Sequence, residues 1–191
     1  NEVFDLASFP KRLLVIGGGY IATEFAGIFN GLGSQVTQLY RGNLFMRGFD
    51  DDIRRFAAKE IRKTGIDLRF STNIESLNPI SDGYQATLTD GTTLVVDTVL
   101  CATGRHPNIE GLGLEHTKVT LNNRGYVKAD AQFQTDEPSI FALGDMTGGP
   151  QLTPVAIAQA MAFAHTQFGN DPRAMDYEFI PTAVLSQPNI G

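Results

Sequence analysis

The sequence predicts an α/β protein whose first half is a parallel, doubly wound sheet with an inserted β-meander. Strand-like and helix-like segments alternate across residues 11–70, which is the order that builds a parallel sheet. Residues 84–96 change to the pattern of a hairpin, and the apolar segment 97–104 can then return to the parallel sheet. The meander is therefore expected as an insertion within one fold.

The elements of the parallel sheet follow one another with recognisable ends. Residues 12–17 form an apolar run typical of a buried strand, and residues 34–40 and 66–70 are expected as the next two strands. A helix starts at Tyr20 and stops at "GLG", and its expected apolar face is Ile21, Phe25, Ile28, Phe29 and Leu32. A second helix at 49–65 begins with acidic residues and ends at Gly65, and its expected apolar face is Ile53, Phe56, Ala57 and Ile61.

The second half of the chain is richer in loops. A hairpin turn is expected at Asp90-Gly91, within the meander. Farther along the chain, strands are expected near 125–130 and 139–145, and a further strand begins within 179–191. A helix is predicted over 154–168, with Thr153 as its N-cap and Gly169 beyond its end. Cys101 lies in the apolar run "VLCAT" and is expected as a small, buried core residue.

Composition disfavours several classes of protein. The chain has 191 residues and a formal net charge of −6, and its Lys and Arg form no dense block, which argues against a nucleic-acid surface. Its apolar runs are far shorter than a membrane span of about 20 residues. Residues 1–10 lack the basic start and apolar core of a signal peptide, so we expect a cytoplasmic protein with no membrane partner. One cysteine and three histidines without metal-ligand spacing predict neither an internal disulfide nor a metal site.

A glycine-rich loop joins the first strand to the first helix. In the pattern Gly17-x-Gly19-x-x-Ala22, the first glycine allows a tight turn and the second lets a pyrophosphate approach the backbone. Ala22 is small enough for the helix to pack closely on the strand, and the helix N-terminus then faces the phosphates. Because strand, helix and second strand are all in place, the loop predicts a dinucleotide site in a Rossmann-like fold. A purely structural turn is the alternative.

The end of the second strand indicates which dinucleotide is bound. An NAD or FAD site has an acidic residue there for the ribose hydroxyls, yet no Asp or Glu occurs between Ser34 and Phe49. Arg41 and Arg47 stand there instead, and two guanidinium groups suit the doubly charged 2′-phosphate of NADP. We therefore expect NADPH. The alternative is that both arginines are ordinary solvated surface residues.

Three further residues have both a functional and a plain structural interpretation. Asp145 in "LGDMTGGP" follows an apolar strand, where ligands bind at a sheet edge, but an Asx turn explains it equally well. Glu24, one turn into its helix, is commonly no more than a favourable partner of the helix dipole. Tyr20 could equally be a core aromatic residue.

Five motifs in order resemble the flavin-dependent disulfide reductases, and most closely the glutathione reductases within that family. They are "GGGYIATEFAG", the strand-end arginine pair, "ATGRHPN", "FALGD" and "LTPVAIA", and together they span nearly the whole chain. In that family NADPH reduces FAD, FAD reduces a Cys-x4-Cys pair, and the dithiol reduces a disulfide substrate. The resemblance therefore implies NADPH and FAD as cofactors and glutathione disulfide as the substrate.

For NADPH, the resemblance implies a role for each matching residue. Gly17, Gly18, Gly19 and Ile21 would hold the pyrophosphate, while Tyr20 would be a lid over the nicotinamide pocket. Glu24 would lie beside the nicotinamide, ion-paired with a lysine of the flavin domain. Arg41 and Arg47 match the 2′-phosphate clamp, and Gly104 and Arg105 match residues along the NADPH channel. Gln151 matches the segment between flavin and nicotinamide, and Ala183 matches the nicotinamide side.

For FAD, the resemblance implies a partial site. Asp145 matches the residue that binds the flavin ribityl chain, and Gln151, Leu152 and Thr153 match the segment between flavin and nicotinamide. The positive end of the helix that follows could then stabilise an anionic reduced flavin. The chain has neither a second glycine loop for the FAD pyrophosphate nor a Cys-x4-Cys pair, so it contributes no catalytic residue of its own.

The resemblance also implies how the chain is organised. Residues 1–10 would be a linker from the FAD domain, 11–104 the NADPH domain, 105–165 the returning C-terminal part of the FAD domain, and 166–191 the start of an interface domain. We expect a piece of a longer homodimeric enzyme that is inactive alone. The family usually has His-Pro at Gln187-Pro188, which leaves the site assignments intact. Trypanothione or mercuric reductase, or a non-catalytic NADPH-binding module, are alternatives; dihydrolipoamide dehydrogenase is disfavoured because it uses NAD.

Overall fold

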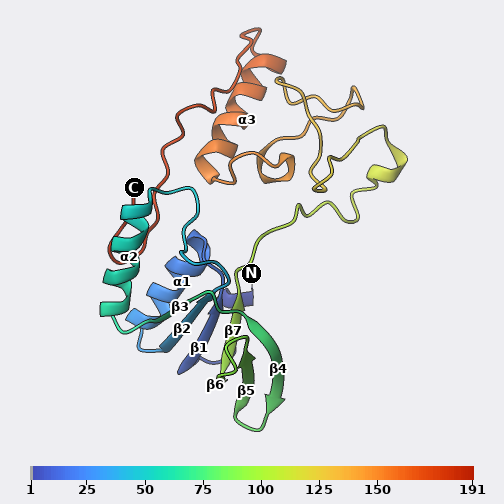
Figure 1. The fold of residues 1–191 in the computed structure, drawn as a ribbon. Helices are drawn as coiled ribbons and strands as arrows, with labels where there is room; N and C mark the ends of the chain where they lie inside the picture. The colour runs from blue at the N-terminus through green and yellow to red at the C-terminus, as the bar shows by residue number, and fades with distance from the viewer. Residues whose placement is uncertain (1) are drawn as a thin grey trace. The chain divides into compact units, whose positions relative to one another are not determined.

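The computed structural model describes residues 2–191, which form two compact units. One unit comprises the chain up to Gly104 together with Pro181–Gly191, and the other is Arg105–Ile180 (Figure 1). Two expected boundaries differ from this division. The first residues belong to the first unit, where Val3 and Leu6 pack against its core, and residues 166–180 stay with the second unit.

A four-stranded parallel sheet is the centre of the first unit. Its order is β3-β2-β1-β7, built from Asp67–Phe70, Gln35–Tyr40, Arg12–Ile16 and Thr98–Cys101. Helix α1 (Tyr20–Gly31) connects β1 to β2, and helix α2 (Asp51–Lys63) connects β2 to β3. The predicted α/β class, the three first strands and the returning strand are therefore confirmed.

The apolar run of β1 is buried on both faces of the sheet. Leu13 and Val15 point into a core with α1 and α2, whereas Leu14 and Ile16 point into a second core with the meander. Because successive side chains of a strand alternate between faces, only a continuous apolar run can serve both cores. This explains why "LLVI" shows no polar alternation.

The inserted meander is a separate antiparallel sheet of three strands, drawn in Figure 1 beside the parallel sheet. It consists of β4 (Ile74–Ile80), β5 (Gly83–Leu88) and β6 (Thr93–Val96), with the predicted turn at Asp90-Gly91 between the last two. The sequence analysis did not identify β4. Its side chains are almost all exposed, so burial imposes no apolar alternation on it.

The buried faces of the two helices agree with the prediction only in part, since Phe29 of α1 and Ala57 and Ile61 of α2 are buried as expected. In α1 the buried residues are Ala22, Thr23, Ala26 and Phe29, while Ile28 and Leu32 are exposed. In α2 they are Ala57, Ala58 and Ile61, while Ile53 and Phe56 are exposed. Small side chains let a helix approach the sheet closely, so the alanines face the sheet. A prediction based on large apolar residues instead expects Ile and Phe to face it. The side chain of Asp50 caps α2 by accepting from the amides of Asp52 and Ile53.

Cys101 is exposed, and its expected burial is wrong. It is the last residue of β7, an edge strand of the parallel sheet that pairs with β1 alone. An edge strand has one flank without a neighbouring strand, so an apolar sequence does not guarantee burial there.

The second unit contains one long helix and few regular strands. Its elements are η2 (Leu114–His116), η3 (Gly144–Thr147) and α3 (Thr153–Phe168). The strands expected near 125–130 and 139–145 are reduced to single bridges, Leu121–Val127 and Gln134–Phe141, because most of the backbone hydrogen bonds there close turns. Within residues 2–191 no helix is both long and apolar enough to cross a membrane.

Helix α3 begins one residue earlier than predicted. Leu152 occupies the N-cap position in extended conformation, so Thr153 and Pro154 are the first two helical residues and Thr153 is not the N-cap. No side-chain hydrogen bond caps this end. The expected strand at the end of the chain is also a single bridge, between Val184 and Ile190.

Candidate dinucleotide site

The loop of Gly17, Gly18 and Gly19, here called the glycine loop, is confined on one side and open on the other. A Cβ on Gly17, whose φ is +146°, would lie 2.3 Å from the carbonyl oxygen of Ala102, and one on Gly18 would lie 2.4 Å from the Tyr40 ring. A Cβ on Gly19 would meet no atom within 4 Å. The first two glycines are thus required by the fold, whereas the bare backbone at Gly19 faces open space, as a close pyrophosphate needs.

Hydrogen bonds from the neighbouring elements hold the glycine loop. The Gly17 amide donates to the Leu39 carbonyl (2.9 Å), and the Gly17 carbonyl accepts from Nε2 of the fully buried Gln38 (3.1 Å). The hydroxyl of Thr23 donates to the Gly19 carbonyl (3.0 Å). Gln38 and Thr23 were not predicted from the sequence. The strand of Gln38 also contains Gln35 and Thr37, so a further polar residue gave no distinct signal.

Residues 41–49, here called the arginine loop, follow β2 at the carboxyl edge of the sheet. Arg41 and Arg47 are both exposed, and within the described chain no side-chain hydrogen bond or ion pair joins either guanidinium to another residue. Every other arginine of the first unit has protein partners: Arg12, Arg54, Arg55, Arg62 and Arg69. The two predicted residues are therefore the ones whose cationic groups remain available to an anion.

The acidic residues after the arginine loop are already engaged. Asp50 accepts from two amides of the first turn of α2, and Asp51 and Asp52 pair with Arg54 and Arg55. Their charges are partly balanced within α2, and no carboxylate lies in the loop itself. The loop therefore presents two exposed guanidiniums and no carboxylate, a combination with which a multivalent anion such as a phosphate can form charge-assisted hydrogen bonds.

The last segment of the chain contacts the helix that leaves the glycine loop. Oε1 of Glu24 accepts a hydrogen bond from the Leu185 amide at 2.8 Å, although 161 residues separate the two. Val184 and Ile190 are buried in the core with α1 and α2, while Ala183 is exposed beside them. Tyr20 is 38% exposed, and Ile21 is half-buried. Glu24 and the segment of Ala183 are thus brought together at one end of α1.

Gly104 and Arg105 lie at the boundary between the two units. Gly104 has φ +146°, and a Cβ there would meet nothing within 4 Å. Arg105, the first residue of the second unit, is exposed. Each is accessible to a ligand within its own unit.

The predicted FAD residues lie together in the second unit. Asp145 is exposed in η3, whose first residue, Gly144, donates its amide to Oε1 of the buried Gln159 of α3 at 2.7 Å. This contact holds η3 against α3, and Leu152 and Thr153 stand at the start of the same helix. Nε2 of Gln151 reaches the Tyr126 hydroxyl at 3.4 Å. The second unit therefore carries Asp145 on an element packed against α3, the helix that Leu152 and Thr153 begin.

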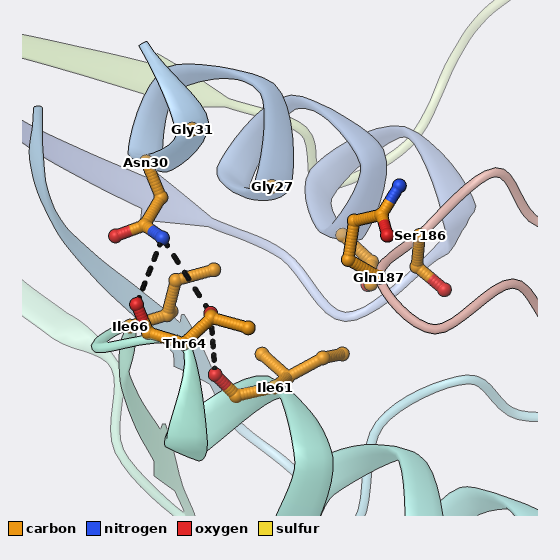
Figure 2. A pocket seen from close by; sticks show the side chains of 9 residues that line it. Gly27, Asn30, Gly31, Ile61, Thr64, Ile66, Ser186 and Gln187 are labelled. Atoms are coloured by element: carbon orange, nitrogen blue, oxygen red, sulfur yellow. Dashed lines mark hydrogen bonds between the residues drawn. The ribbon is translucent and has the colours of Figure 1, made fainter. Parts of the chain in front are cut away.

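A hollow of about 270 Å³ lies elsewhere in the first unit, between the ends of α1 and α2 and the segment of Ser186 and Gln187 (Figure 2). There the side-chain amide of Asn30 donates to the Thr64 carbonyl at 3.1 Å and so links the two helix ends. None of the predicted cofactor-binding residues lines this hollow. No residue of the glycine loop or the arginine loop lines it either, although Thr23, which donates to the Gly19 carbonyl, does.

Comparisons with known proteins identify the family of this chain. A family model described as pyridine nucleotide-disulphide oxidoreductase matches residues 1–160. A glutathione reductase from Burkholderia cepacia is 47% identical over 188 residues, which cover 98% of this chain and 42% of that protein. A trypanothione reductase from Trypanosoma congolense is 40% identical over 195 residues, covering 100% and 40%. The chain spans about two fifths of the length of these relatives.

Solved structures give the same grouping. The HOCl-induced flavoprotein disulfide reductase RclA from Escherichia coli matches with a TM-score of 0.91 and 31% sequence identity, over 98% of this chain and 43% of that one. The family match covers most of the chain, and the chain has the glycine loop, the parallel sheet and the inserted meander. The chain belongs to the pyridine nucleotide-disulphide oxidoreductase family.

Proposed function

We propose that the first unit binds NADPH and selects it over NADH. The observation that carries this proposal is the pair of exposed guanidiniums of Arg41 and Arg47, without protein partners among the described residues, at the end of β2. Gly19 leaves its backbone open to the pyrophosphate, and the N-terminus of α1 adds a positive potential there. Tyr20 and Glu24 border the end of α1 where the nicotinamide would lie.

We also propose that the second unit forms part of an FAD site. Asp145 would accept hydrogen bonds from the ribityl hydroxyls, and the uncapped start of α3, with Leu152 and Thr153, would face the flavin ring. When bound, NADPH supplies a hydride and FAD accepts it. Within the first unit, Glu24, fixed by the Leu185 amide, and Ala183 would define the nicotinamide side, and Gly104 would lie along its approach. Gln151 and Arg105 are the residues of the second unit that are proposed to bind NADPH.

For the whole protein we propose an NADPH-dependent disulfide reductase with glutathione disulfide as substrate, acting as a homodimer. The glutathione reductase relative at 47% identity supports this substrate, and the trypanothione reductase at 40% is the reason to keep a second one. The 191 residues contain no Cys-x4-Cys pair, so the chain alone is expected to be inactive. The full-length enzyme should be assayed with both disulfides, and turnover of glutathione disulfide by the isolated chain would contradict the proposal.

The cofactor preference is tested with Arg41→Met/Arg47→Met in the full-length protein. Each charge-assisted hydrogen bond to a phosphate contributes about 1.5–3 kcal/mol, so NADP⁺ affinity should fall roughly 10²–10⁴-fold. The affinity for NAD⁺ should move little, and Arg41→Glu should reverse the preference further by repelling the phosphate. Dissociation constants measured by calorimetry at low and high salt provide the check, because salt should shrink the parent's preference.

A matched control removes two charges from the same unit without touching the arginine loop. Arg55→Met/Lys59→Met serves this purpose, because both residues are exposed on α2. If the arginine double variant and this control change the ratio of NADP⁺ to NAD⁺ affinity equally, the effect is one of general charge. The proposed 2′-phosphate clamp would then be wrong.

The FAD assignment has its own test. Asp145→Ala should lower the flavin content of the purified full-length protein while the ratio of NADP⁺ to NAD⁺ affinity stays unchanged. Asp130→Ala is a control in the same unit, because Asp130 is exposed and accepts amides of its own turn. An Asp145→Ala protein that retains the parent's flavin content would remove Asp145 from the site.

A further inference from the structure

We propose that Arg54 is a positioning residue for cofactor selectivity: it does not bind the 2′-phosphate itself but fixes the arginine loop that does. The inference rests on the proposed NADPH function. Arg54 lies in the first turn of α2, and its side chain is only 13% exposed. It is therefore unlike Arg41 and Arg47, which are exposed.

All three nitrogens of the Arg54 guanidinium have partners. Nε donates to the Phe45 carbonyl at 2.6 Å and Nη2 to the Leu44 carbonyl at 2.7 Å. Nη1 donates to Asp51, which keeps the group anchored on its own helix. A planar guanidinium presents donors on three nitrogens in a fixed fork that fits two successive carbonyls and a carboxylate, whereas the three donors of a lysine all lie on one nitrogen. Arg54 thus ties α2 to the middle of the arginine loop.

The attachment point lies between the two proposed phosphate ligands. Phe45 and Met46 are buried, with exposed fractions of 0% and 2%, while Arg41 and Arg47 extend from either side of them. The amide of Met46 donates to the Gly18 carbonyl at 2.6 Å, which connects this middle segment to the glycine loop. The distance between each guanidinium and the pyrophosphate is therefore set by a segment that Arg54 holds.

The backbone of this segment needs support. Met46 has φ +55°, a left-handed conformation that costs a non-glycine residue free energy unless its surroundings hold it there. The loop has no helix or strand of its own between Tyr40 and Asp51. Without Arg54, two carbonyls lose their donors and the loop gains alternative conformations, in which the two arginines no longer converge on one phosphate.

The test compares Arg54→Met with Arg55→Met in the full-length protein, using NADP⁺ and NAD⁺ as probes. Both variants lose one positive charge from neighbouring positions, but Arg55 pairs with Asp51 and Asp52 and makes no hydrogen bond to the loop. Arg54→Met should lower the ratio of NADP⁺ to NAD⁺ affinity roughly tenfold, as expected when a charge-assisted hydrogen bond is lost. Arg55→Met should leave the ratio within about twofold, because exposed pairs contribute little.

A double-mutant cycle separates this inference from the proposed function. In the Arg41→Met/Arg47→Met background, Arg54→Met should cause no further loss of preference, because the groups that it positions are gone. If the arginine double variant itself keeps the parent's preference, the proposed function fails. If that variant loses the preference but Arg54→Met keeps it, the inference about Arg54 fails alone.

Arg54→Lys keeps the inference testable if Arg54→Met does not fold. It retains the charge but replaces the planar fork by one ammonium nitrogen, so its preference for NADP⁺ over NAD⁺ should lie between those of the parent and Arg54→Met. Arg54→Lys with the parent's full preference would overturn the positioning role, since charge alone would then suffice.

Discussion

The glycine loop and the arginine loop belong to one candidate site but are built differently. In the glycine loop steric contact adds to the hydrogen bonds, because the Ala102 carbonyl and the Tyr40 ring leave no room for a Cβ at Gly17 or Gly18. The arginine loop is fixed by hydrogen bonds from Arg54 and by two buried side chains. A rigid, uncharged loop serves any dinucleotide, whereas an irregular, charged loop can distinguish one dinucleotide from another. This difference predicts that variants of the glycine loop change the affinity for both dinucleotides, whereas variants of the arginine loop change the preference for NADP⁺ over NAD⁺.

Gly17→Ala should have the largest effect. The new Cβ would lie 2.3 Å from a backbone oxygen at a φ of +146°, so both the clash and the conformation oppose it. We expect the free energy of unfolding to fall by about 3–5 kcal/mol, with loss of both cofactors. Gly33→Ala is the control, because it has a positive φ but open space around it. Thermal unfolding and cofactor titration measure the two effects, and equal destabilisation of the two variants would contradict the steric argument.

Gly19→Ala should separate binding from folding. A Cβ there meets nothing within 4 Å and the φ of −91° suits alanine, so the melting temperature should change by only a few degrees. The methyl group would occupy the space proposed for the pyrophosphate, so both dinucleotides should weaken roughly 10–100-fold with an unchanged ratio. Unaltered affinity for both dinucleotides would show that the pyrophosphate does not approach Gly19.

Gln38→Leu should have a smaller effect on the glycine loop. The Gly17 carbonyl loses its side-chain donor, which costs about 1–3 kcal/mol, but the variant also removes Oε1, which has no hydrogen-bond partner in the described structure. We expect a net loss of about 1 kcal/mol in unfolding free energy and a few-fold weakening of both dinucleotides. Gln35→Leu at the exposed first position of the same strand is the control. A change in the ratio of NADP⁺ to NAD⁺ affinity would show that the two loops are not independent.

Asp97→Asn should leave both loops unaffected and alter only the pH dependence of stability. Hydrogen bonds from the side chain and amide of Arg12 lower the pKa of Asp97. The stabilisation is therefore complete above the unfolded-state pKa of about 3.9 and is lost as pH falls through the lower folded-state value. The free energies of unfolding of parent and variant, measured from pH 7 to pH 3, should converge below about pH 4. A difference in unfolding free energy that stays the same at every pH would contradict this prediction.

Local sequence patterns were sufficient for the parallel sheet. The run at Leu13–Ile16, the glycine loop and the helices around it depend on interactions between near neighbours, and all were predicted. The faces of α1 and α2 were predicted only in part, because the choice between Phe56 and Ala58 depends on how closely the helix packs on the sheet. The same reason applies to Cys101, whose exposure follows from the edge position of β7.

The sequence by itself determined that this chain has a dinucleotide loop followed by a strand end with arginines and no acid. Both features are local. The first is a strand–turn–helix, and the second is the presence of two arginines and the absence of Asp and Glu within the 16 positions Ser34–Phe49. Only the tertiary structure decided which arginines are available and which are structural, since Arg41 and Arg54 look alike in a list of residues. Availability depends on which carbonyls and carboxylates come within hydrogen-bonding distance, and that is fixed by the packing of α2 against the loop. The contact between Glu24 and Leu185 is of the same kind, because no local pattern can join residues 161 positions apart.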